Sequence, residues 1–277
     1  MKYLKEKDAI KILDLEDFNI VQILECGQIF RFVIDENIAV VYSKDKKAEI
    51  ETKEDHVIIK TNDVDYFENF FDLKTDYSKI KQELKKDKFL FKAVDYGKGI
   101  RILNNDAYEM IVSFIISANN NIGRIKKSIE YLCVHFGTNM GDYFAFPTLT
   151  QLKVATVQDF KNAGLGYRSE QMYETVNSLT ENDLVNLKTL DKEEQFKFLI
   201  SLKGIGEKVA NCIMLFGLGV KDVFPVDTWI NKVYNKLTNS TETNRPKITK
   251  ELTTRYGNLS GYAQQYFFYY FRENSIK

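Results

Sequence analysis

The pattern of apolar and polar residues changes character along this chain. Between about residues 17 and 61 it alternates in short runs, such as 29–34 and 38–42, which are separated by polar turn residues. Alternation with a period of two is typical of strands that bury one face. The pattern therefore predicts a small antiparallel sheet near the N-terminus, and the run 99–103 is a candidate further strand of that sheet.

Helical spacing replaces the alternation from Val64 onward, and after Asn105 nearly every apolar run recurs every three to four residues. The expected helices after Asn105 cover 106–118, 121–136, 149–162, 168–179, 192–200, 206–217, 228–237 and 261–273. The chain is thus predicted to be an α+β protein. Residues 1–105 would form an antiparallel sheet domain with helices, and residues 106–277 an all-helical domain.

Length and cysteine usage limit the classes of protein that fit. A chain of 277 residues with 44% hydrophobic residues can bury a substantial core. Its three cysteines, Cys26, Cys133 and Cys212, form no CxxC pair, which argues against a disulfide framework and a four-cysteine metal site. The first residues are charged and no run has the length of a membrane span. We expect a soluble, cytoplasmic protein.

The overall charge gives no support to nucleic-acid binding. Lys and Arg number 39, as do Asp and Glu, so the formal net charge is zero, whereas DNA-binding domains usually carry a basic excess. A basic face can nevertheless coexist with a neutral total, and backbone amides at helix starts bind phosphate without adding formal charge.

A glycine hairpin, Gly204-Ile205-Gly206, separates two of the expected helices. Glycine permits the positive φ and the close backbone approach that a tight reversal between helices requires. Amides at the start of the second helix could then hold a DNA phosphate. For an isolated Gly-x-Gly, however, a purely structural helix turn is the commoner explanation.

Lys208 makes a structural explanation less satisfactory. It falls in the first turn of the second helix, where the positive end of the helix dipole disfavours a cation and favours a neutral, nucleophilic amine. Cys212 follows one turn later, so it shares the face of Lys208 and could form part of a pocket wall. The commoner role of a lone cysteine is that of a small buried apolar residue.

Asp227 precedes another apolar helical pattern and is placed as its N-cap. A capping carboxylate has a direction that its own hydrogen bonds hold. Such a carboxylate could stabilise positive charge that develops on a sugar, or activate a nucleophile. The structural and the catalytic role can coexist in one residue.

Five ordered motifs, together with Lys208 and Asp227, make the chain resemble the helix-hairpin-helix DNA glycosylase superfamily, and within it the 8-oxoguanine DNA glycosylases. The resemblance extends from Gly27 to Phe268 and includes the hairpin. The other motifs are Gly27-Gln28-Ile29-Phe30-Arg31-Phe32, Ser113-Phe114-Ile115-Ile116-Ser117-Ala118-Asn119-Asn120-Asn121-Ile122-Gly123-Arg124-Ile125, Gly164-Leu165-Gly166-Tyr167-Arg168 and Gly261-Tyr262-Ala263-Gln264.

The resemblance implies a bifunctional base-excision repair enzyme, a DNA glycosylase with DNA lyase activity. Lys208 would attack C1′ of the damaged nucleotide, expel 8-oxoguanine and form a Schiff base that leads to β-elimination, and Asp227 would assist. The substrate would be duplex DNA that carries 8-oxoguanine opposite cytosine, with the damaged nucleotide flipped out of the stack. The enzyme would act as a monomer, associate with the nucleoid through DNA and require no cofactor.

By the same resemblance, four residues would recognise the flipped base. The carbonyl of Gly27 would accept a hydrogen bond from N7–H, a donor that guanine lacks. Phe268 and Cys212 would cover the two faces of the base, and Gln264 would read its Watson–Crick edge. Without the motif that follows it, Gly27 would be read as a strand bulge.

Further residues would contact the DNA and the opposite base. Asn119 would fill the gap in the duplex, and Tyr167 would act as a wedge nearby. Arg124 and Arg168 would bind the stranded cytosine. Gly204 and Gly206 would lie at the phosphate-binding hairpin, where the backbone of Ile200, Leu202 and Ile205 is the candidate site of a structural monovalent cation.

Two other functions are compatible with parts of this pattern. A glycosylase of other specificity on the same scaffold, for example one that excises alkylated purines, would need Asp227 but ordinarily no lysine nucleophile. A non-enzymatic DNA-binding protein could use the helix-hairpin-helix only to hold phosphates. Lys208 favours the lyase interpretation over both alternatives.

Overall fold

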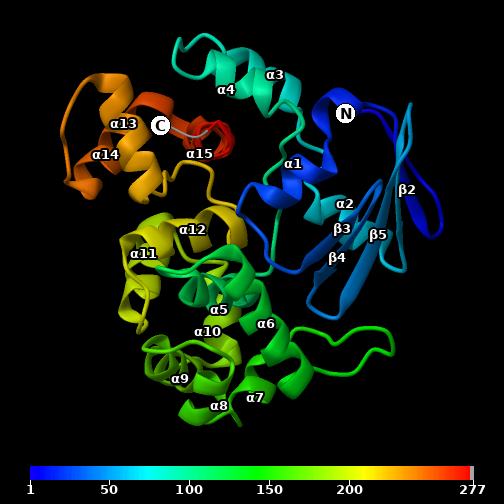
Figure 1. Ribbon diagram of the computed structural model, residues 1–277, viewed down its shortest axis with the longest axis vertical. Helices are drawn as coiled ribbons and strands as arrows, with labels where there is room; N and C mark the ends of the chain where they lie inside the picture. Colours follow the sequence, from blue (N-terminus) through cyan, green and yellow to red (C-terminus); the bar gives the residue numbers. More distant parts are fainter. Residues whose placement is uncertain (275–277) are drawn as a thin grey trace.

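The computed structural model describes residues 1–274, and it places a β-sheet beside a larger assembly of helices. Figure 1 shows the sheet at one side, in blue and cyan, and the helices of the second half of the chain at the other. No helix within the described residues combines the length and the apolar character that crossing a bilayer would need.

The sheet has six strands in the order β1-β2-β6-β5-β4-β3, and every neighbouring pair is antiparallel. The strands are β1 Tyr3–Lys5, β2 Ala9–Ile12, β3 Phe32–Asp35, β4 Ile38–Ser43, β5 Lys46–Thr52 and β6 Val57–Thr61. Alternating residues of the sheet are buried, among them Val41, Ile50 and Ile59. They pack with the short helices α1 (Ile20–Glu25) and α2 (Val64–Phe70) in one apolar cluster.

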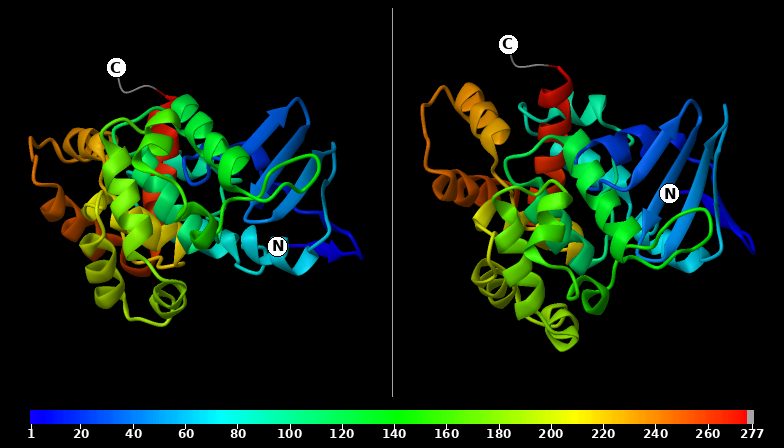
Figure 2. Two further views of the ribbon diagram at one scale, coloured as in Figure 1. Left: turned by 90° about the horizontal axis from the view of Figure 1, so that it is seen from below. Right: turned by 60° about the horizontal axis from the view of Figure 1, so that its bottom comes forward.

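The remaining elements are helical and confirm the predicted α+β class. They are α3 Tyr77–Leu84, α4 Phe91–Tyr96, α5 Ala107–Ser117, α6 Ile122–Phe136, α7 Leu149–Leu152, α8 Val157–Asn162, α9 Arg168–Ser178, α10 Glu181–Leu187, α11 Lys192–Ser201, α12 Glu207–Gly217, α13 Thr228–Thr238, α14 Arg245–Tyr256 and α15 Ser260–Glu273, with 3-10 turns at Leu15–Asp17 and Gly257–Leu259. Figure 2 shows α15, in red, running through the middle of the helical assembly.

The predictions after Asn105 were wrong at one helix, which is divided in two, and at two helices that were missed, and in each case a capping residue marks the true helix start. The expected helix 149–162 is two helices, α7 and α8, because Thr148 and Thr156 each begin a new helix with a capping box. The prediction also missed α10, which Thr180 caps in the same way, and α14, which Asn244 caps and which carries a proline in its first turn. These signals are present in the sequence.

Two predictions in the N-terminal part were also wrong. The region read as sheet from residue 17 begins with α1, which Asn19 caps by accepting a hydrogen bond from the amide of Gln22. The prediction missed β1 and β2, which precede this region and extend the sheet.

Residues 99–103 form no strand, because side chains rather than a neighbouring strand bond to their backbone. Gln28 donates to the carbonyl of Arg101 (2.7 Å) and accepts from the amide of Leu103 (2.8 Å), while the Tyr77 hydroxyl accepts from the amide of Ile102 (2.8 Å). This segment is the connection between the sheet and the helical assembly, and its buried backbone groups are satisfied without a ladder.

Two apolar clusters divide the core. The first contains the sheet, α1 and α2, and the second contains the later helices together with residues of α3 and α4, among them Leu84 and Val94. Of the helices before residue 105, α1 and α2 therefore pack with the sheet, and α3 and α4 pack with the later helices. The limit between residues 105 and 106 stays a prediction, and residues 275–277 of the predicted second domain lie outside the described residues.

Arg101 is the largest fully buried side chain, and its guanidinium lies among backbone carbonyls at the junction of the two parts. It donates to the carbonyls of Phe71 (3.0 Å), Asp17 (3.1 Å) and Thr75 (2.9 Å), and lies 4.0 Å from the centroid of the Tyr77 ring.

Replacement of Arg101 by Met should lower the free energy of unfolding by ~3 kcal/mol or more, because each buried carbonyl left without a donor costs about 1 to 3 kcal/mol. Urea denaturation followed by circular dichroism measures the change. Lys98→Met, at an exposed position nearby, is the matched control and should have little effect. Equal stability of the two variants would contradict this account.

Glu109 is a buried acid where α5 meets the sheet. Its side chain is 5% exposed and accepts a hydrogen bond from Ser43 of β4 at 2.9 Å. Burial, followed by the nearby Asp106 carboxylate, raises the pKa of Glu109 to about 7, although the Arg31 guanidinium opposes this rise. The folded state therefore binds a proton at Glu109 more tightly than the unfolded chain does.

Because the folded pKa lies above the unfolded one, Glu109 stabilises the protein below about pH 4.5 and loses this contribution as the pH rises through about 7. Relative to Glu109→Gln, the wild-type free energy of unfolding should fall by up to ~3 kcal/mol over that range. Urea midpoints of both proteins at a series of pH values provide the measurement. Parallel pH profiles would exclude Glu109 as the titrating group.

Candidate active site

The predicted hairpin joins α11 to α12. Gly204 has φ +79°, and Gly206 is the N-cap residue of α12. The amide of Ile205 donates to the carbonyl of Leu202 at 3.3 Å, and the Thr175 hydroxyl of α9 donates to the carbonyl of Lys203 at 2.7 Å. The reversal is therefore held both by its own backbone and by a neighbouring helix.

Lys208 is the second residue of α12 and is partly buried. Its Nζ lies 5.5 Å from the centroid of the Phe114 ring of α5. Within residues 1–274 it forms no ion pair at 4.0 Å or less. An amine at a helix start, against an aromatic face and without a carboxylate partner, can approach an incoming electrophile.

Asp227 and Cys212 lie in the electrostatic environment of Lys208. Asp227 is the N-cap of α13, as predicted, and its carboxylate accepts from the amide of Ile230 at 2.8 Å. Burial raises the pKa of the Cys212 thiol, with an opposing effect of Lys208 and a further rise from Asp227. The fold thus brings the two predicted catalytic groups toward the same buried thiol, although they come from two different helices.

Gly27 lies in the turn after α1, not in a strand bulge, and has φ +81°. A Cβ added to Gly27 would lie 3.0 Å from the ring of Phe268, so the structure brings these two predicted pocket residues into contact. Gln28, the next residue, is fully buried and bonds to the connection described above. Among the described residues none donates a hydrogen bond to the carbonyl of Gly27.

Gln264 of α15 is 5% exposed, and its Oε1 is buried without a hydrogen-bond partner in residues 1–274. Buried amide oxygens are normally satisfied, and an unsatisfied one is a candidate ligand contact. Gln264 therefore has an acceptor without a partner among the described residues, and its role in reading a base stays a prediction.

The Asn119 turn connects α5 to α6. Asn119 is exposed and has φ +49°, a backbone conformation that is uncommon outside glycine. Arg168 is buried beneath this turn, donates from Nη1 to the carbonyl of Ala118 at 2.9 Å, and lies 4.8 Å from the centroid of the Tyr167 ring. Arg168 thus connects the start of α9, where Tyr167 lies, to the turn that carries Asn119.

The predicted contacts differ in how exposed they are. Tyr167 is 63% exposed and Arg124, in the first turn of α6, is exposed. Ile200 is 42% exposed, whereas Leu202 and Ile205 are buried. The bond to Ala118 uses one of the five N–H donors of Arg168, and its buried Nε has no hydrogen-bond partner among residues 1–274.

Phe114 is a part of the site that the sequence did not single out. Its ring lies between Lys208 and Phe30, 5.7 Å from the centroid of the Phe30 ring, and stacks on Phe216 at 5.7 Å. It therefore links the lysine of α12 to the segment between Gly27 and β3. It belongs to the motif 113–125, but its helical spacing is that of an ordinary core residue, and the motif alone did not assign it a role.

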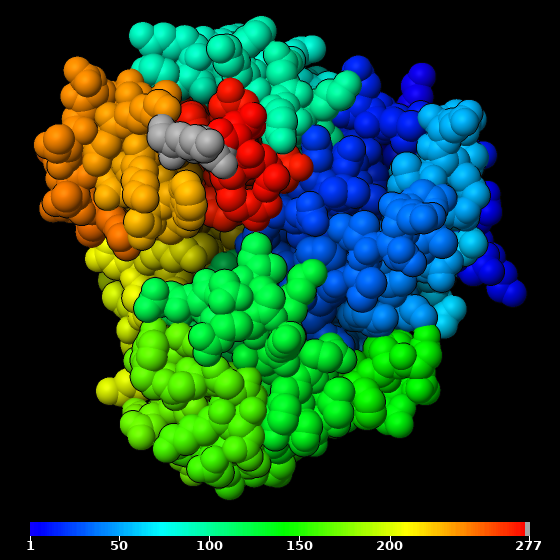
Figure 3. All heavy atoms as spheres, in the orientation of Figure 1, coloured from blue at the N-terminus to red at the C-terminus, as the bar shows by residue number. Residues whose placement is uncertain are grey.

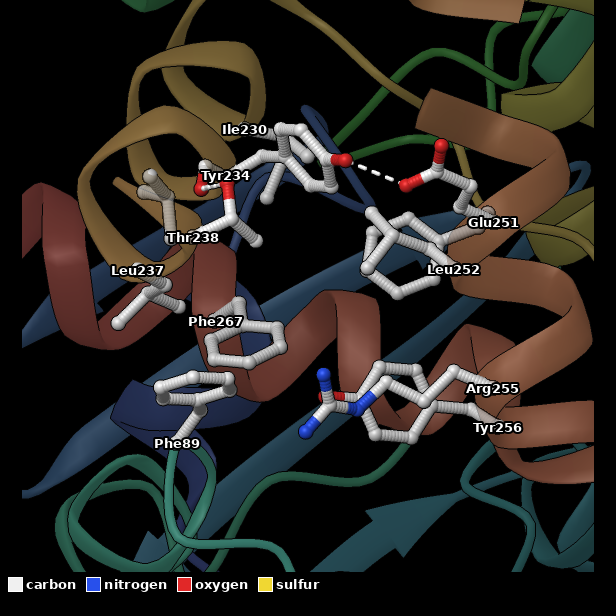
Figure 4. Close-up of a pocket in the computed structure, with 12 residues that line it drawn as sticks. Phe89, Ile230, Tyr234, Leu237, Thr238, Glu251, Leu252, Arg255, Tyr256 and Phe267 are labelled. Carbon is white, nitrogen blue, oxygen red and sulfur yellow. Dashed lines mark hydrogen bonds between the residues drawn. The ribbon is translucent and has the colours of Figure 1, made fainter. Parts of the chain in front are cut away.

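A separate apolar cavity of about 260 Å³ lies between α13, α14 and α15 (Figure 4). Phe267 and Leu237 are among its lining residues, and a hydrogen bond from Tyr234 to Glu251 crosses its edge. None of the predicted catalytic or pocket residues lines it. It lies behind the helix that Asp227 caps, and not at the reacting groups.

Comparison with family models matches both parts of the chain. Residues 11–111 match the model of the N-terminal domain of 8-oxoguanine DNA glycosylase. Residues 112–258 match the HhH-GPD superfamily of base excision DNA repair proteins. The two matched regions adjoin, and together they include all predicted site residues except Gln264 and Phe268.

Individual relatives agree with the family models. A probable N-glycosylase/DNA lyase of Methanothermobacter thermautotrophicus is 30% identical over 76% of this chain and 75% of its own length. The N-glycosylase/DNA lyase of Arabidopsis thaliana is 31% identical over 66% of this chain, and the chain spans about half of that protein, 55%.

A solved structure extends the likeness to the whole fold. The 8-oxoguanine glycosylase/lyase of Clostridium acetobutylicum, in complex with double-stranded DNA containing cytosine opposite 8-oxoG, has a TM-score of 0.92 and 36% identity. The match covers 100% of this chain and 99% of that one. The sheet and the helical assembly are therefore arranged alike in both proteins.

Proposed function

This chain belongs to the 8-oxoguanine DNA glycosylase family within the HhH-GPD superfamily, and on that basis we propose that it removes 8-oxoguanine from duplex DNA, opposite cytosine, and then cleaves the strand as a DNA lyase. The proposal gives each part of the site a chemical task. Base removal requires a nucleophile at C1′, and strand cleavage by β-elimination requires that this nucleophile be an amine that forms a Schiff base.

The observation that carries the proposal is the position of Lys208. The amine stands in the first turn of α12, without an ion pair among the described residues, and both it and Asp227 influence the same buried thiol. In the proposed reaction Nζ attacks C1′ of the flipped nucleotide, the C1′–N9 bond breaks, and the base leaves. Asp227, oriented by its bond to the amide of Ile230, stabilises the positive charge that develops on the sugar.

Base recognition in this proposal depends on hydrogen-bond direction. The Gly27 carbonyl accepts from N7–H of 8-oxoguanine, whereas guanine presents an acceptor at N7 and would leave two acceptors opposed. Such a mismatch costs about 1 to 3 kcal/mol. The free Oε1 of Gln264 accepts from the Watson–Crick edge, and Phe268 and Cys212 cover the faces of the ring.

DNA is held, in this proposal, on the side of the hairpin and the Asn119 turn. Amides at Gly204 and Gly206 bind phosphate, and Asn119 and Tyr167, both exposed, enter the space that the flipped nucleotide leaves. Arg124 and Arg168 donate to the acceptors of the stranded cytosine.

We further propose that a monovalent cation reinforces the hairpin through the carbonyls of Ile200, Leu202 and Ile205. The Leu202 carbonyl already accepts from the amide of Ile205 and retains a second lone pair. A cation at this point would hold the reversal without taking part in the chemistry of Lys208.

Borohydride trapping tests the nucleophile. The wild-type protein should form a covalent adduct with a duplex that carries 8-oxoguanine opposite cytosine, because reduction captures the Schiff base. Lys208→Gln should form none while it still binds the duplex in a gel-shift assay. Lys203→Gln, an exposed lysine of the same hairpin, is the matched control and should be trapped as the wild type is.

Two results would count against this mechanism. An adduct that survives Lys208→Gln would place the nucleophile elsewhere in the chain. An intact wild-type enzyme that excises an alkylated purine but not 8-oxoguanine would assign the scaffold a different substrate.

Arg124 is expected to contribute to the choice of opposite base. The quantity to measure is the ratio of the single-turnover excision rates with cytosine and with adenine opposite the lesion. Arg124→Ala should lower this ratio about tenfold, because one good base contact contributes ~1.4 kcal/mol. Lys127→Ala, which removes an exposed cation from the same helix, should leave the ratio as it is. An unchanged ratio in Arg124→Ala would remove Arg124 from this role.

A further inference from the structure

One face of α15 contacts three consecutive residues at the turn after α1. Gln265 donates from Nε2 to the carbonyl of Cys26 at 3.2 Å, the ring of Phe268 lies against Gly27, and Arg272 donates from Nη2 to the carbonyl of Glu25. The spacing of these α15 residues, three and then four positions, places them on one side of the helix.

The contacts join parts of the chain that are far apart in sequence. In Figure 3 the end of α15, in red, touches the blue N-terminal region, which contains α1. Gln265 is 1% exposed, so its amide has no access to solvent and its bond to Cys26 is not replaced by water. Arg272 also lies 5.5 Å from the centroid of the Phe268 ring, so it contacts both the pocket aromatic and the turn.

The carbonyl that Arg272 bonds to is the last of α1. Carbonyls at a helix C-terminus have no partner inside the helix and carry its negative partial charge, which favours a cationic donor. Arg272 therefore does more at this position than pair with Glu273, to which its Nη2 also donates at 2.8 Å.

The backbone conformation of Gly27 has to be fixed by contacts with other residues, because glycine restricts its own φ and ψ angles less than any other residue does. Without a Cβ, its φ and ψ are free over a wide range, and the observed φ of +81° is one of several accessible values. The residue after it is held by the buried Gln28 side chain and by Asn105, which donates to the carbonyl of Gln28 at 3.3 Å. The residues before it, Glu25 and Cys26, are held by α15.

We propose that Gln265 and Arg272 are positioning residues for base recognition: they hold the backbone on the N-terminal side of Gly27 so that its carbonyl points at N7–H of 8-oxoguanine. The inference rests on the proposed function and adds to it two residues that touch neither the base nor the sugar. A carbonyl that is free to rotate would accept the same hydrogen bond only after losing backbone entropy, so excision of the base would slow.

The test separates base recognition from the chemistry of Lys208. A duplex with a preformed abasic site requires the lysine but has no base to recognise. Arg272→Met, which keeps side-chain length and removes the donor, should slow single-turnover excision of 8-oxoguanine by about tenfold. Cleavage at the abasic site should stay within about twofold of wild type. Gln265→Leu should give the same separation of the two rates.

A binding measurement gives an independent readout. The Lys208→Gln variant cannot react, so it allows binding to be measured alone. In this background we compare the affinity for a duplex with 8-oxoguanine opposite cytosine with the affinity for a duplex with guanine opposite cytosine. The ratio of these affinities should fall several-fold when Arg272→Met is added. Arg272→Lys should recover part of this preference, because an ammonium can still donate to the Glu25 carbonyl.

Glu273→Ala is the matched control. It removes the ion pair of Arg272 and leaves the bond to Glu25, so both rates should remain at the wild-type level. Because Gln265 and Arg272 act on one turn, the effect of Arg272→Met should be smaller in the Gln265→Leu background than in the wild type.

Loss of excision and abasic-site cleavage in equal measure in Arg272→Met and Gln265→Leu would show a general structural role and overturn the proposal. Unchanged excision and affinity in both variants would also overturn it. Failure of the proposed function would be seen in the wild-type protein itself. If the wild type excises no 8-oxoguanine and yields no borohydride adduct, the proposed function is overturned, and the positioning role of Gln265 and Arg272 with it.

Discussion

The arrangement of the proposed site depends on how the turn at Gly27, between the buried residues Cys26 and Gln28, is held by two parts of the molecule. Gln28 bonds to the backbone of residues 101 and 103, and Gln265 of α15 bonds to Cys26 on the other side of the glycine. Buried polar groups need hydrogen-bond partners, and here the partners come from the connection between the sheet and the helices and from α15. The requirement to satisfy this backbone therefore links the sheet, the connection and α15.

In the proposed mechanism the chemistry and the recognition come from different elements. Lys208 lies in the first turn of α12 and Asp227 is the N-cap of α13. Both positions are set by the sequence immediately around them. The proposed base pocket needs an unpaired backbone carbonyl, which the interior of a helix does not offer because its carbonyls are paired, and an unpaired side-chain oxygen, which a helix can carry. A turn after a short helix supplies the carbonyl of Gly27, and α15 supplies Gln264 and Phe268.

Two ionisable side chains, Arg101 and Glu109, are buried at the junction of the two parts, where desolvation destabilises a charge and hydrogen bonds compensate for it. Arg101 satisfies several carbonyls at once and so compensates for its own desolvation. Burial, and then the nearby Asp106 carboxylate, raises the pKa of Glu109, and its hydrogen bond from Ser43 only partly compensates for the desolvation. The junction therefore has satisfied hydrogen-bonding groups around Arg101, and its stability depends on protonation at Glu109.

The sequence by itself determined the α+β class, most of the helices after Asn105, the hairpin and the cap at Asp227, because apolar periodicity, glycine and capping residues act locally. It also indicated the family through motifs that lie far apart. Only the tertiary structure decided that residues 99–103 pair with side chains instead of strands, that Phe114 lies between Lys208 and Phe30, and that Arg168 is buried under the Asn119 turn. These are contacts between residues distant in the chain, and no local pattern encodes them because each depends on where the whole fold places its partner.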